Sequence, residues 1–143
     1  MYDSKSPNVH ALNKVYQNSR AAIEAIDCLI PKVKDESMKK DLASQILGHH
    51  NLIKSAAAKL HEVHHYPHEP NLFSTAVSTR LKSAVDSSDS HIAEILIENS
   101  TAGMINIQRG LNNRDNLTQD VSGISGEAVS FEQANINKLC AYL

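Results

Sequence analysis

Tryptophan is absent from the sequence, and aromatic residues of all kinds make up only 4% of it. A core without large rings has to be built from aliphatic side chains and alanine, which suits closely packed helices. The two cysteines, Cys28 and Cys140, are far apart and follow no metal-binding spacing. We therefore expect reduced thiols rather than a disulfide framework, as in cytoplasmic proteins.

Long hydrophobic runs are also missing. No stretch approaches the roughly 20 apolar residues of a membrane-spanning helix, and residues 1–7 lack the apolar centre of a signal peptide. The formal net charge of -2 gives no attraction to nucleic acid or to an anionic membrane. These absences predict a cytoplasmic protein that binds neither nucleic acid nor membranes.

Apolar residues spaced by three and four positions are what the sequence does contain. This spacing is typical of helices that bury one face. It predicts four helices in a single domain over residues 1–143, with Asn8 capping the first of them. Prolines and clusters of polar residues separate the helices, which we expect at about residues 8–31, 36–66, 90–112 and 116–142.

The connection between the second and third helices decides the topology. One helix over residues 72–112 would be about 60 Å long, whereas the other three would be about 40 Å. A break near Ser87–Ser90 removes this mismatch, because Asp and Ser favour helix starts over helix interiors. Residues 67–89 then form a helical crossover, and the fold is all-α, a ferritin-like four-helix bundle.

Two segments carry a resemblance to a known family. Residues 30–42 (IPKVKDESMKKDL) and residues 91–104 (HIAEILIENSTAGM) resemble small, uncharacterised bacterial ferritin-like proteins. The resemblance implies a four-helix bundle over most of the chain. The wider superfamily implies a carboxylate-bridged centre of two metal ions that handles iron, oxygen or peroxide.

The standard ligand set of such a centre is incomplete in this sequence. It requires a Glu from each of two helices and Glu-x-x-His from each of the other two. The expected fourth helix has no histidine, and the literal Glu-x-x-His at residues 62–65 lies at a helix end. A reduced site suited to iron, manganese or zinc would use side chains near the middle of the bundle. Its candidate ligands are Glu24, His49 or His50, Glu98, and Glu132 or Glu127.

The same residues have a plainer interpretation. His49 falls on the apolar stripe of the expected second helix and can pack in the core, while the glutamates lie on solvated helix flanks. A second histidine cluster follows, formed by His61, His64, His65 and His68. Its spacing could chelate a metal at the surface, but a helix end beside two prolines supports ligands poorly, which favours simple solvation.

Three functions stay open from the sequence. A non-enzymatic bundle would act through binding or self-association as a dimer, with polar residues on the core stripes fixing the helix register. A metal-binding bundle would use the reduced Glu/His site. A carrier would hold a small apolar ligand between helices, where glycines leave room. We favour the first, because the metal motif is incomplete and no phosphate-binding loop or nucleophile motif is present.

Overall fold

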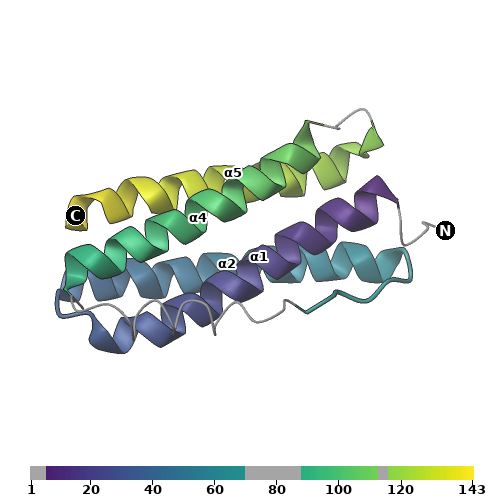
Figure 1. Cartoon of the computed structure of the whole chain (residues 1–143). Helices are drawn as coiled ribbons and strands as arrows, with labels where there is room; N and C mark the ends of the chain where they lie inside the picture. The colour runs from purple at the N-terminus through teal and green to yellow at the C-terminus, as the bar shows by residue number, and fades with distance from the viewer. Residues whose placement is uncertain (1–5, 70–87, 113–115) are drawn as a thin grey trace.

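The computed structural model describes residues 6–69, 88–112 and 116–143. It contains four long helices and two short 3₁₀ helices, with no strand in those residues (Figure 1). The elements are α1 (Pro7–Leu29), η1 (Ile30–Lys32), α2 (Glu36–Glu62), α4 (Asp89–Leu111), α5 (Gln119–Leu139) and η3 (Cys140–Tyr142). The expected all-α bundle of four helices is confirmed, and the helices at 90–112 and 116–142 lie close to their expected bounds.

The start of α4 lies beside the connection between α1 and α2. The carboxylate of Asp89 accepts the backbone N–H groups of Lys34 and Asp35, at 2.8 and 2.9 Å. α2 and α4 therefore run in one direction, and α1 and α5 run in the other (Figure 1). The chain leaves α2 at one end of the bundle and enters α4 at the opposite end. The expected helical crossover falls mostly on residues 70–87, outside the described residues.

Two capping residues explain where helices begin. Ser88 precedes α4, and its hydroxyl accepts the backbone N–H of His91 at 3.2 Å. Asp35 precedes α2, and its carboxylate accepts the N–H of Met38 at 2.8 Å. Each cap satisfies a backbone donor that has no partner within its helix. The expected helix start near Ser87–Ser90 is confirmed.

Two local expectations are wrong. Asn8 does not cap α1, because it lies inside the helix, where its side chain accepts the N–H of Thr118 at 3.0 Å. α2 ends at Glu62, earlier than expected, and His64 takes a positive φ of 63°. The chain then turns back onto α1, where the N–H of His68 donates to Asn13 at 3.0 Å. This tertiary contact could not be read from local propensity.

The interior divides into two apolar clusters. The first apolar core surrounds the α1–α2 connection, the start of α4 and the end of α5, and it contains Ala25, Ile26, Leu29, Val33, Met38, Leu42, Ile92, Ala93, Ile95, Leu96 and Leu139. The second apolar core lies at the other end and contains Val9, Ala11, Leu12, Val15, Tyr16, Leu52, Ala56, Leu60, Ile107, Val121 and Ala128. Polar side chains occupy the level between them.

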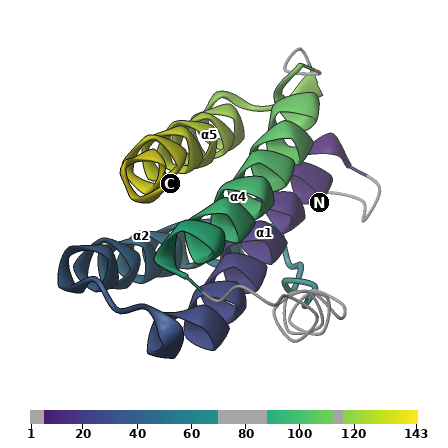
Figure 2. The same cartoon turned by 60° about the vertical axis from the view of Figure 1, so that its left-hand side comes forward.

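The helices are not equally close. α4 packs along α5 and α1 packs along α2, and α1 and α4 also lie side by side, whereas α2 and α5 are farther apart (Figure 2). No helix in the described ranges is both long and apolar enough to cross a membrane. α2 and α5 make fewer direct contacts than the other neighbouring helices do.

Candidate functional site

Polar side chains from all four helices meet in the middle of the bundle. We call this group the polar centre. It consists of Asn18 and Ser19 on α1, Gln45 and His49 on α2, Asn99 on α4 and Glu132 on α5. His49 and Glu132 are each only 1% exposed, and Gln45 is 4% exposed. Burying so much polarity costs free energy unless the groups bind one another or a ligand.

His49 links α2 to both α1 and α5. Its Nδ1 lies 3.0 Å from the hydroxyl of Ser19, and its Nε2 lies 3.2 Å from Glu132 Oε1. When the Ser19 hydroxyl donates to Nδ1, the hydrogen is on Nε2 and faces the carboxylate. A neutral imidazole can therefore accept from Ser19 and present its N–H to Glu132 at the same time. His49 is therefore a core residue, as the plainer interpretation held, and it also orients the carboxylate.

Ser19, His49 and Glu132 are the residue types of a nucleophilic triad. Ser19 is 0% exposed, however, and it does not line the cavity described below. A nucleophile has to reach its substrate, and this hydroxyl is enclosed by the bundle. The geometry therefore favours a structural link between three helices over acyl transfer.

A small cavity adjoins the carboxylate. It has a volume of about 20 Å³ and is lined by Asn18, Gln45, His49, Asn99, Ser100 and Glu132, together with aliphatic residues. Within the described part of the chain, Glu132 Oε2 lacks a hydrogen-bond partner, and Oε1 has only the contact with His49 Nε2 at 3.2 Å, whose geometry is poor for a hydrogen bond. The amide nitrogens of Asn18, Gln45 and Asn99 lack one as well. Unmet donors and unmet acceptors thus face the same enclosed space.

Phe131 covers the polar centre on the α2–α5 side. Its ring meets the ring of His49 edge-on, with centroids 4.8 Å apart and planes at 85°. A Cβ at position 48 would overlap this ring, so Gly48 is the residue that allows the close approach. A glycine inside a helix costs roughly 1 kcal/mol relative to alanine, and this close contact gives Gly48 its structural reason.

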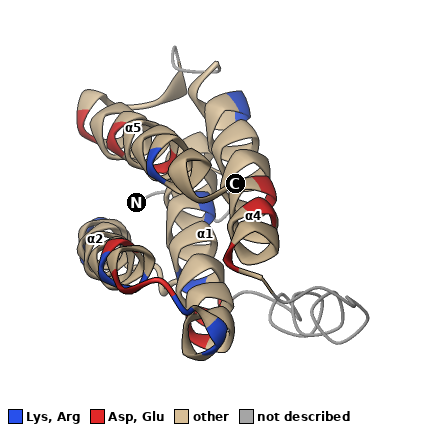
Figure 3. Cartoon of the chain, turned by 90° about the vertical axis from the view of Figure 1, so that its left-hand side faces the viewer, with Lys and Arg blue, Asp and Glu red and all other residues tan. Residues whose placement is uncertain are grey.

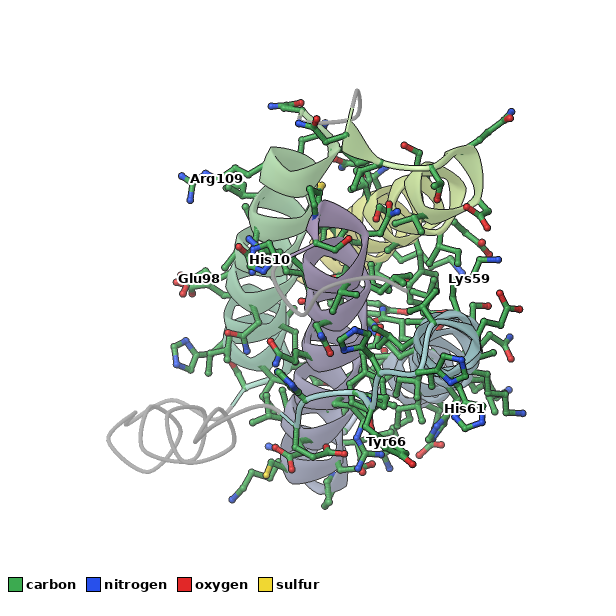
Figure 4. All side chains as sticks on the ribbon, turned by 90° about the vertical axis from the view of Figure 1, so that its right-hand side faces the viewer. His10, Lys59, His61, Tyr66, Glu98 and Arg109 are labelled. Atoms are coloured by element: carbon green, nitrogen blue, oxygen red, sulfur yellow. The ribbon has the colours of Figure 1, made fainter. Side chains whose placement is uncertain are left out.

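Most of the expected metal ligands do not converge. Glu24, His50, Glu98 and Glu127 are exposed, and Glu98 points away from the bundle (Figure 4). The structure brings together only His49 and Glu132 of the five residues Glu24, His49, His50, Glu98 and Glu132. Across residues 6–69, 88–112 and 116–143, no three His, Cys, Asp or Glu side chains are grouped to hold a metal ion. The reason is the helical phase, which turns the other three side chains toward solvent.

The second histidine cluster does not lie on one helix face. His61 is the last of its members on α2, while His64, His65 and His68 follow the helix end. The ring of His61 packs against Tyr66, with centroids 6.4 Å apart (Figure 4). The helical spacing on which surface chelation depends is therefore interrupted after His61.

Asn18 and Gln45 were not foreseen as members of the site. Gln45 precedes His49 by four residues and so lies on the same face of α2, which was the available signal. Ser19, Asn99 and Asn135 are among the polar residues on core stripes that we expected to fix the helix register, and Ser19 and Asn135 are buried. The spacing could not show that they share one level, because that level depends on how the helices slide past one another.

The surface charges form pairs of opposite sign. Acidic and basic residues both occur on each of the four long helices (Figure 3). Lys59 on α2 binds Asp120 on α5 at 2.5 Å, and this hydrogen bond lowers the pKa of Asp120 to about 2. On α1, burial and the hydrogen bond that the Tyr16 hydroxyl donates to Glu69 raise the pKa of Tyr16. On the four long helices, charges of both signs are therefore interspersed.

Comparison with known proteins supports the fold alone. No model of a protein family matches the chain, and no curated protein matches it. Among solved structures, the chain is similar to "YcfI, a putative structural protein from Rhodopseudomonas palustris", with a TM-score of 0.69. The match covers 95% of this chain and 92% of that one, at 11% sequence identity. At this identity the likeness defines the class of helical bundle and gives no function.

Proposed function

We propose that this protein is a non-enzymatic, ferritin-like bundle that acts through self-association in the cytoplasm. The ferritin-like topology is part of the proposal, and the positions of the ends of α2 and α4 support it. The enclosed cavity of about 20 Å³ holds no more than one water-sized group, which is too small for an organic substrate. The role therefore belongs to the surface rather than to the interior.

The observation that carries the proposal is the exposed α2–α5 face. Leu47, the neighbour of Gly48 in the sequence, has 68% of its surface exposed. Beside it is an open groove of about 390 Å³, lined by Gly48, Asn51, Leu52, Glu127, Ser130 and Phe131. Gly48 and Asn51 line the groove from α2, and Ser44 and Ser55, one turn away on either side, are also exposed and uncharged.

The occupant that this face fits is a second copy of the chain. A two-fold contact places the same patch on both sides, so charges on the patch would meet like charges. The groove contains only one charged side chain, Glu127. In such a pair, Leu47 of each copy would enter the groove beside Phe131 of the other and bury apolar surface. The small side chains along α2 also permit close approach between α2 of one copy and a helix of the other.

Sedimentation equilibrium on the full chain tests this proposal. We expect a dimer for the wild type, a monomer for Leu47→Lys, and a dimer for Ile105→Lys. Ile105 is a matched control, because it is an aliphatic residue on α4 that is 44% exposed. A wild type that stays monomeric at high micromolar concentration would contradict self-association. A dimer that survives Leu47→Lys would move the interface elsewhere without removing the function.

Metal binding is the second candidate. Its support is the pair of His49 Nε2 and Glu132 Oε1 at 3.2 Å, with a carboxylate that lacks a hydrogen-bond partner in the described residues. Iron, manganese or zinc would need further ligands, and the side chains that complete the cavity are amides rather than carboxylates or histidines. Elemental analysis of untagged protein after mild chelation decides this. About one equivalent of retained metal, lost in His49→Leu, would establish the site.

A further inference from the structure

The cavity in the polar centre is lined by polar side chains from every long helix. Asn18 comes from α1, Gln45 and His49 from α2, Asn99 and Ser100 from α4, and Glu132 from α5. The atoms without a hydrogen bond are three amide nitrogens, which donate, and the carboxylate oxygens of Glu132, which accept and of which Oε1 has only the 3.2 Å contact with His49. A ligand that satisfies this set has to accept and donate hydrogen bonds at the same time.

Size and chemistry then select the ligand. A volume of about 20 Å³ accommodates about one water molecule. One water molecule can accept hydrogen bonds from two of the three amides and donate hydrogen bonds to the carboxylate. A metal ion of the same size would face three N–H donors, and each amide would have to turn its oxygen inward before it could bind.

The same two asparagines form the wall between this cavity and solvent. Asn18 and Asn99 also line an open groove of about 450 Å³ between α1 and α4, which contains Lys14, Asn106 and Arg109. A Cβ at position 103 would overlap the amide of Asn18, so Gly103 leaves the space in which that amide sits. Asn18 and Asn99 are the residues that line both the cavity and the groove.

We propose that the polar centre is a binding site for one exchangeable water molecule, and that Asn18 and Asn99 form its path to solvent. The water completes a hydrogen-bond network that joins all four helices at one level. This inference is independent of self-association, because none of its residues lines the α2–α5 groove. Failure of either proposal leaves the other standing.

The first experiment measures long-lived water by oxygen-17 magnetic relaxation dispersion on the metal-free, full-length protein. We expect one such water per chain in the wild type and none in Gln45→Leu, which removes a donor and fills the cavity. Gln17→Leu is the matched control, because Gln17 lines the outer groove only, and this variant should retain the water. Absence of long-lived water in the wild type, or its equal loss in both variants, would overturn the site.

The second experiment tests the path. Asn18→Ala removes part of the wall, so we expect the residence time of the buried water to fall by about tenfold. A tenfold change in rate corresponds to a barrier lower by roughly 1.4 kcal/mol. Asn106→Ala, which changes an amide of the outer groove alone, should leave the residence time unchanged. Equal residence times in both variants would exclude the Asn18 path.

An atomic-resolution crystal structure of the wild type keeps the proposal testable even if the variants fail to fold. It should show one oxygen atom within hydrogen-bond distance of both Gln45 and Glu132. Elemental analysis of the same preparation should find less than a tenth of an equivalent of metal, on the order expected of contamination. A stoichiometric metal ion at that position would contradict the proposed water site and support the metal-binding alternative.

Discussion

The two apolar cores and the polar centre between them hold the same four helices by different means. The cores bury aliphatic side chains, whose stabilisation is roughly proportional to area and tolerates small shifts of one helix along another. The polar centre buries a His–Glu pair and three amides, which are costly unless each has a partner in one specific geometry. The ends thus supply most of the stability, and the middle discriminates between alignments of the helices.

Separating His49 from Glu132 should have the largest effect. His49→Leu leaves a buried carboxylate without its partner, and we expect the free energy of unfolding to fall by about 3–5 kcal/mol. Urea denaturation measures the loss. The double variant His49→Leu/Glu132→Leu removes the buried charge as well and should recover most of it. A single variant as stable as the wild type would show that the pair does not govern the centre.

A truncation in the first apolar core should cost somewhat less. Leu42 is 0% exposed, and Leu42→Ala should lower the free energy of unfolding by about 3 kcal/mol through lost burial and the cavity left behind. Ile105→Ala, at an exposed site, should change it by about 0.5 kcal/mol or less. Unlike the His49 variant, Leu42→Ala should have no second-site partner whose removal restores stability.

The contact between Asp89 and the α1–α2 connection should have a moderate effect. Asp89→Ala removes the carboxylate that accepts the N–H groups of Lys34 and Asp35. We expect a loss of about 1 kcal/mol, because these donors can turn to water at this partly exposed site. Ser90→Ala, at the next and exposed position, is the control. An unchanged melting temperature in both would mean that the first core alone positions α4.

The surface pair of Lys59 and Asp120 should have the smallest effect and should depend on pH. The pKa of Asp120 is lowered to about 2 by its hydrogen bond to Lys59, against an ordinary value of 3.8. Its contribution is therefore present above pH 3.8 and is lost as the pH falls toward 2. Thermal melts from pH 5 to about pH 2 should show a slightly smaller decline for Asp120→Asn than for the wild type. Identical slopes would mean that solvent screens the pair completely.

The sequence predicted the fold more accurately than it predicted the residues of the site. The stripe through Leu42 and His49 predicts both the helix and its buried face, since 3.6-residue periodicity is a local property. Ser88 was foreseen as part of a helix start for the same reason. Glu98 and His50 were placed in a site because their height along the bundle was suitable, but their helical phase turns them outward. A one-residue difference rotates a side chain by about 100° and decides between core and solvent.

The sequence by itself determined the four helices, their approximate bounds and the aliphatic character of the core, because these follow from local spacing, capping residues and composition. Only the tertiary structure decided that Ser19, Gln45, His49 and Glu132 meet at one level. It also decided that Asn18 lines the cavity beside them. Those contacts depend on the relative translation and rotation of different helices. Packing sets these, through features such as the ring of Phe131 lying against Gly48.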